Sequence, residues 1–124
     1  MKRALRLACA TAAVLAAIAV ATAPTFATDA RCDIRTNSGV YAGSCEFTAT
    51  KGGSFSIAPI GRPEFFAHAK DDPGITLISA EIRGSRAEVS GLTTDGIDSR
   101  WGKANRSPRD RACWVGEDFS ICVY

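Results

Sequence analysis

The sequence predicts an all-β domain, a small antiparallel sandwich or barrel of about seven short strands held by two hairpin disulfides. Short segments rich in β-branched and aromatic residues recur along the chain, and glycine-containing turns separate them. No long stretch has the 3.6-residue apolar period of a helix. Four cysteines follow residue 27, and they face each other in pairs if neighbouring segments form hairpins.

Residues 1–27 are typical of a signal peptide. Lys2, Arg3 and Arg6 give a basic start, residues 7–20 are apolar or small, and the segment ends in Thr25, Phe26 and Ala27. Cleavage after Ala27 would leave residues 28–124 as a single domain. The apolar run is rich in alanine and shorter than the ~20 residues of a membrane helix. We therefore expect export to a bacterial periplasm or the exterior, with no membrane span after cleavage.

The positive charge of the chain resides in this leader. The whole sequence has 15 basic and 13 acidic residues, and three of the basic ones belong to residues 1–27. The remaining domain has 12 basic and 13 acidic residues, a net charge of −1. This balance gives no electrostatic basis for nucleic-acid binding.

The first predicted hairpin joins residues 31–37 to residues 40–50. A two-residue turn at Ser38 and Gly39 would place Cys32 opposite Cys45 at a non-hydrogen-bonded position, where Cβ atoms are closest. The sequence therefore predicts a disulfide between Cys32 and Cys45.

The last predicted hairpin lies within residues 109–124. A turn centred on Glu117 and Asp118 would place Cys113 opposite Cys122, again at a non-hydrogen-bonded position. An even number of cysteines in a short exported chain indicates disulfides and an oxidising compartment. Neither pair has the C-x-x-C spacing of zinc or thioredoxin-like sites, so we expect no metal and no cofactor.

The middle of the chain contributes the other strands. Residues 54–60, 75–82, 86–92 and 97–106 have β-favouring composition and are separated by turns rich in glycine, aspartate and serine. Residues 64–70 are ambiguous, because Pro63 could open one turn of helix or precede an edge strand. The alternative fold is therefore α+β with one short helix near residues 64–70.

Catalytic signatures are sparse. His68 is the only histidine, and Glu64 could serve it as the second member of an acid–base pair in a small secreted hydrolase. No G-x-S-x-G elbow and no calcium-binding loop occurs in the sequence. The pattern favours a protein without catalytic activity.

The candidate binding segment covers residues 100–111. It contains five basic residues, one tryptophan and a single acidic residue, Asp110, and its candidate contact residues are Arg100, Trp101, Lys103, Arg106, Arg109 and Arg111. Strand alternation would put Trp101 and Lys103 on one face and Arg100 and Arg106 on the other. Such a segment can contact an anionic partner. In the alternative interpretation, Trp101 packs in the core and the arginines pair with carboxylates.

Three functions are compatible with these patterns. The first is a small exported binding or inhibitor-type module that contacts an anionic partner, either a cell-envelope polymer or an acidic protein, without catalysis. The second is a small secreted hydrolase that uses Glu64 and His68. The third is a structural component of the cell envelope.

Overall fold

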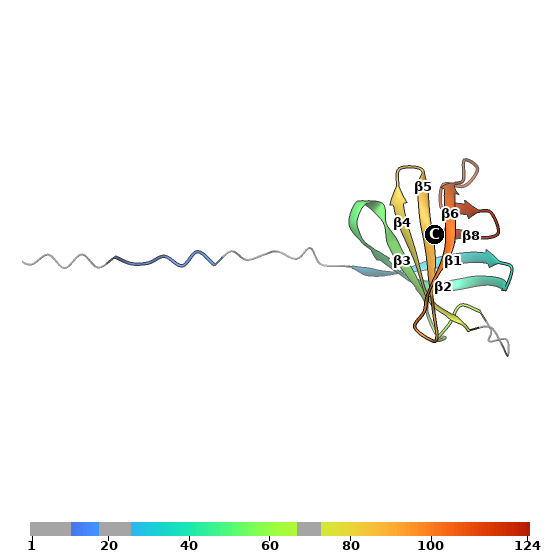
Figure 1. The fold of residues 1–124 in the computed structure, drawn as a ribbon, viewed down its shortest axis with the longest axis horizontal. Helices are drawn as coiled ribbons and strands as arrows, with labels where there is room; N and C mark the ends of the chain where they lie inside the picture. The colour runs from blue at the N-terminus through green and yellow to red at the C-terminus, as the bar shows by residue number, and fades with distance from the viewer. Residues whose placement is uncertain (1–10, 18–25, 67–72) are drawn as a thin grey trace, which may run out of the picture.

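The computed structural model describes residues 11–17, 26–66 and 73–124, and their eight strands form a closed antiparallel barrel (Figure 1). The predicted all-β fold is confirmed, with eight strands in place of about seven. The strands are β1 (Ala27–Thr36), β2 (Gly39–Ala49), β3 (Phe55–Pro59), β4 (Ile75–Arg83), β5 (Arg86–Thr93), β6 (Asp98–Arg106), β7 (Cys113–Gly116) and β8 (Ser120–Val123).

Each strand pairs with the next one in sequence, and β8 closes the barrel by pairing with β1. The closing register runs from Cys32 opposite Val123 to Arg35 opposite Ser120. Tyr124 extends it, because its N–H donates to the Arg31 carbonyl at 2.8 Å and its carbonyl accepts the Arg31 N–H at 3.0 Å. Closure by the last residue leaves both β1 and β8 paired on two sides.

Inward-facing side chains fill the barrel. Eight strands enclose a space just wide enough for side chains. The largest wholly buried residues are Phe65, which precedes β4 in the chain, and residues of strands spread around the wall, namely Ile34, Ile57, Ile78, Ile121 and Val89. Each of the five aliphatic residues occupies an alternating buried position of its strand, as period-two patterning requires.

Both predicted disulfides form, on opposite faces of the barrel wall. Cys32 and Cys45 are wholly buried within the core, whereas Cys113 and Cys122 lie beside the inward-facing Trp114 and Ile121 and therefore point outward. Two covalent bonds of this kind are consistent with an oxidising, exported environment.

The predicted register of the first hairpin is wrong by two residues. Cys32 lies opposite Gly43 and Ala30 lies opposite Cys45, so the disulfide joins diagonal positions whose Cα atoms are 5.8 Å apart. The turn is centred on Asn37 and Ser38, and the Thr36 hydroxyl closes it by accepting the Ser38 N–H at 3.1 Å. The second hairpin has the predicted register, with Cys113 opposite Cys122.

Strand β6 contains a β-bulge at Trp101. Val89 pairs with Gly102 and Ser90 pairs with Arg100, which leaves Trp101 as the extra residue. The bulge interrupts the alternation, so the predicted division of faces is wrong: Trp101 packs against the core, while Arg100 and Lys103 are both exposed.

The described part of the ambiguous segment, residues 64–66, belongs to neither a helix nor a strand, and residues 67–70 lie outside the described part. Phe65 is buried, and its N–H donates to the Ile75 carbonyl at 2.9 Å. Within the described ranges the one helical turn is η1 (Lys51–Gly53), so the α+β alternative has no support there. No helix in these ranges is long and apolar enough to cross a membrane.

Candidate functional site

Strand β6 runs from one end of the barrel to the other, and it therefore distributes the predicted contact residues over two sites. Arg100 and Trp101 lie near its start, beside the β1–β2 and β7–β8 turns; we call this region the Trp101 end. Arg106 lies at its finish, beside the start of β1 and of β7; we call this region the Trp114 end. Each end has a cavity of its own.

The cavity of the Trp114 end has a volume of about 450 Å³ and combines aromatic walls with arginines. Phe47 and Phe55 form one wall, with ring centroids 5.3 Å apart, and Trp114 lines the cavity as well. Arg106 and Arg111 line the same cavity from β6 and from the loop that follows it. The closed barrel thus brings two of the predicted contact residues together.

Arg106 lies over the indole ring of Trp114. The two residues are cross-strand partners in β6 and β7, and the guanidinium carbon is 4.7 Å from the ring centroid. Trp114 is only 3% exposed, so the ring packs in the core and is held in place. This contact positions the Arg106 cation at the barrel end without neutralising its charge.

Several cations of the candidate segment have no ion-pair partner in the described part of the chain. Arg35, Arg83 and Arg100 each have a carboxylate within 4.0 Å, namely Asp33, Glu81 and Glu88. No described carboxylate approaches Lys103, Arg106, Arg109 or Arg111 in this way. The alternative of arginines paired with carboxylates therefore holds for Arg100 and fails for the rest of the described segment.

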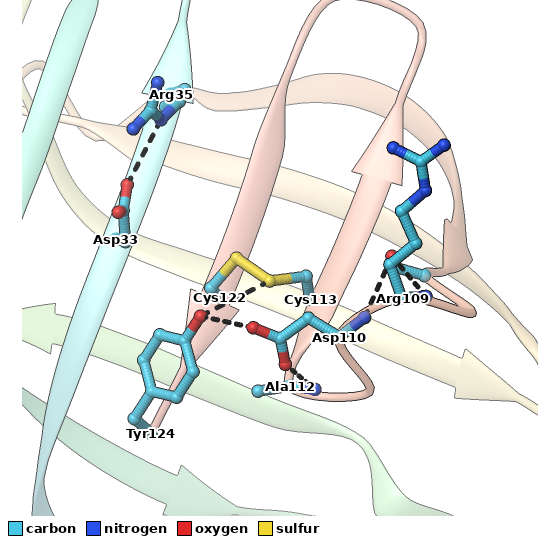
Figure 2. The surroundings of a disulfide bond; sticks show 9 residues. Asp33, Arg35, Arg109, Asp110, Ala112, Cys113, Cys122 and Tyr124 are labelled. Atoms are coloured by element: carbon cyan, nitrogen blue, oxygen red, sulfur yellow. Dashed lines mark hydrogen bonds and ion pairs between the residues drawn. A yellow bond between two sulfur atoms is a disulfide. The ribbon is translucent and has the colours of Figure 1, made fainter.

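Asp110 fixes the loop that carries Arg109 and Arg111 (Figure 2). One carboxylate oxygen, Oδ2, accepts the Tyr124 hydroxyl at 2.6 Å, and the other, Oδ1, accepts the Ala112 N–H at 3.0 Å. The Tyr124 hydroxyl also lies 3.7 Å from the Cys113 sulfur. The only acidic residue of the segment therefore holds the loop, and it forms no ion pair with the arginines of the described segment.

These two hydrogen bonds also alter proton affinities. The Tyr124 hydroxyl and, secondly, the Ala112 N–H stabilise the carboxylate, which lowers the pKa of Asp110. The same hydrogen bond to Asp110 raises the pKa of Tyr124. The contact therefore widens the pH range over which Asp110 is ionised and Tyr124 is protonated.

The other predicted contact residues lie away from this cavity. Arg109 is exposed, and Figure 2 shows its side chain extending away from Tyr124 and the disulfide. Lys103 is exposed on the outer face of β6, opposite Glu88 of β5. Arg100 is on the same outer face, with its Nε 3.9 Å from Glu88.

Trp101 belongs to the cavity at the Trp101 end, which has a volume of about 400 Å³. Its ring meets that of Phe119 edge to face, with centroids 5.6 Å apart. A Cβ atom on Gly91 would come within 2.9 Å of the indole nitrogen, so the absence of a side chain at Gly91 makes room for the ring. Neither cavity was predicted, because each collects residues from distant strands and no single segment signals it.

The described residues give the hydrolase alternative no catalytic constellation. Glu64 is described, but its predicted partner His68 lies outside the described residues. No group of three or more histidine, cysteine, aspartate or glutamate side chains in the described ranges could hold a metal ion.

Comparison with known proteins adds no further constraint on function: the chain matches no protein-family model, no curated protein sequence and no solved structure.

Proposed function

We propose that the protein is an exported, non-catalytic binding or inhibitor-type module that contacts an anionic partner, a cell-envelope polymer or an acidic protein, through the Trp114 end. One observation supports this most directly: Arg106 and Arg111 line one aromatic-walled cavity, and neither has a described carboxylate within 4.0 Å, although Asp29 also lines the cavity. Guanidinium groups bind carboxylate and phosphate oxygens in a planar, bidentate manner.

The surrounding structure favours binding by holding the arginines in place. Trp114 fixes the plane under Arg106, and the Asp110–Tyr124 hydrogen bond fixes the loop under Arg111. Because the arginine side chains and their loop are already ordered, less conformational entropy is lost when a partner binds. Export would add to the positive charge, because cleavage after Ala27 places a new amino group on Thr28, which lines the same cavity.

The test is a titration of the oxidised protein with fluorescently labelled polyphosphate, an anionic polymer probe, at low and at high salt. We expect binding that weakens as salt rises. Arg106→Glu combined with Arg111→Glu should weaken it about tenfold or more, since two charge-assisted contacts are lost.

The matched control is Arg35→Glu combined with Arg83→Glu. It changes the net charge by the same amount, and its two arginines already have carboxylate partners, Asp33 and Glu81, away from the cavity. Binding should be nearly unchanged in this variant. If the two double variants lost polyphosphate affinity equally, net charge alone would account for the binding, and the proposal would be overturned.

A further inference from the structure

The cavity of the Trp101 end lies at one mouth of the barrel, where distant parts of the chain meet. The β1–β2 turn contributes residues 36–38, the start of β6 contributes residues 99–101, and the β7–β8 turn contributes Asp118 and Phe119. Barrel mouths are common sites for small ligands, and the volume of about 400 Å³ lies within the usual range of such sites. The cavity therefore has the place and the size of a small-molecule site.

One wall of this cavity is aromatic. Trp101 is the extra residue of the β6 bulge, and the absence of a side chain at Gly91 of β5 gives its ring room. Phe119 meets the ring edge to face, and Trp101 remains partly exposed. The face of an aromatic ring is negative and attracts the positive edges of C–H groups. This wall therefore suits a ligand that has an apolar face made of C–H groups.

The rest of the lining includes polar side chains that are available to a ligand. Asn37, Ser99 and Asp118 line the cavity, and none of their side chains has a hydrogen-bond partner in the described part of the chain. An amide and a hydroxyl each donate and accept hydrogen bonds, whereas a carboxylate only accepts them. Hydroxyl groups on a ligand would satisfy all three side chains, because a hydroxyl also donates and accepts.

The charges of the lining balance. Among the described residues that line the cavity, one is basic, Arg100, and one is acidic, Asp118. Arg100 is largely exposed, and its Nε already lies 3.9 Å from the carboxylate of Glu88. The described lining therefore offers an ionic ligand no net attraction, and a neutral ligand fits it best.

We propose that the cavity of the Trp101 end binds a neutral saccharide. A sugar ring combines an apolar face of C–H groups with hydroxyl groups around its edge, and this combination matches the aromatic wall and the polar side chains. The C–H face lies against Trp101, and the hydroxyls bond to Asn37, Ser99 and Asp118. The inference does not rest on the function proposed for the Trp114 end, which uses other residues and another cavity.

The test is an NMR titration of the intact protein with two neutral disaccharides, cellobiose and N,N′-diacetylchitobiose. The indole N–H signals of the two tryptophans report the two barrel ends separately. We expect a sugar to shift the Trp101 signal and the backbone amide signals of Asn37, Ser99 and Asp118, while the Trp114 signal stays in place. The affinity should be the same at low and at high salt, because the ligand has no charge.

Matched variants test the polar contacts. Asn37→Ala and Asp118→Ala should each weaken sugar binding about fivefold or more, since each removes hydrogen bonds to the ligand. Both residues are exposed and lie in turns, so their replacement should leave the fold intact. The controls are Asn105→Ala and Glu117→Ala, which alter exposed residues of similar chemistry that do not line the cavity. Both controls should bind the sugar as the unaltered protein does.

Several outcomes would overturn the proposal. One is the absence of a Trp101 shift with both sugars, and another is a shift of the Trp114 signal in its place. A third is an equal loss of affinity in Asp118→Ala and Glu117→Ala, which would remove the carboxylate from the site. If indole, used as a further probe, shifted the Trp101 signal while neither sugar did, the cavity would be assigned to a small aromatic ligand.

Discussion

The hydroxyl of Tyr124, the last residue, donates a 2.6 Å hydrogen bond to the carboxylate of Asp110 across the outer disulfide (Figure 2). The bond joins the end of the chain to the loop that carries Arg109 and Arg111. Because Tyr124 also pairs its backbone with Arg31, one residue connects the closure of the barrel to the order of the proposed binding loop.

Tyr124→Phe should lower stability in a pH-dependent manner. The folded-state pKa of Asp110 is lowered, so its contribution is present above the unfolded pKa and is lost as the pH falls through the folded value. The folded-state pKa of Tyr124 is raised, so its contribution is present below the unfolded pKa and is lost as the pH rises through the folded value.

The difference in unfolding free energy between Tyr124→Phe and the unaltered protein should therefore be constant near neutral pH. It should shrink below about pH 4 and above about pH 10, near the ordinary pKa values of aspartate and tyrosine. Urea unfolding across this range measures it. A difference that grows toward acidic pH would contradict the assignment.

Removal of the two disulfides should have unequal effects. Their sequence separations of 13 and 9 residues predict entropic contributions of about 3 kcal/mol each, differing by only about 0.3 kcal/mol. Cys32 and Cys45 are wholly buried, so Cys32→Ala with Cys45→Ala also leaves a cavity, at a further cost of about 1–2 kcal/mol. Urea unfolding should rank this variant below Cys113→Ala with Cys122→Ala, and the reverse order would contradict the placement of the two bonds.

Gly116→Ala should destabilise the β7–β8 hairpin. A Cβ atom at Gly116 would come within 2.2 Å of the ring of Phe119, which is buried, so the ring would have to move. Overpacking of this kind costs about 1–3 kcal/mol. Val115→Ala is the control, because Val115 is exposed and its replacement should change stability by less than about 0.5 kcal/mol. Similar thermal unfolding midpoints for the two variants would refute the close contact.

Local patterns were enough to predict the hairpins and both disulfides. Alternating segments, short turns and facing cysteines are encoded within a few residues of each other, as in 113–122. The choice between sandwich and barrel was open, because both need strands with one buried face. The pairing of β1 with β8 decides it, and this pairing joins residues at opposite ends of the domain.

Two errors have definite physical causes. A register shift of two residues keeps every side chain on its face, so the apolar pattern could not distinguish Cys45 from Gly43 as the partner of Cys32. The bulge at Trp101 turns the indole ring toward Gly91, a residue of β5 that leaves room for it. The sequence of β6 alone therefore could not predict the bulge. The candidate binding segment is divided between the two barrel ends because β6, which carries most of it, runs the length of the barrel.

The proposed function depends on anion binding at the Trp114 end. The protein has two tryptophans, one at each end, so their indole N–H signals in an NMR titration with polyphosphate report the two sites separately. We expect a salt-sensitive shift of the Trp114 signal and of the backbone amide signals of Arg106 and Arg111, while the Trp101 signal stays in place. A shift of the Trp101 signal alone, or of neither signal at saturating polyphosphate, would contradict it.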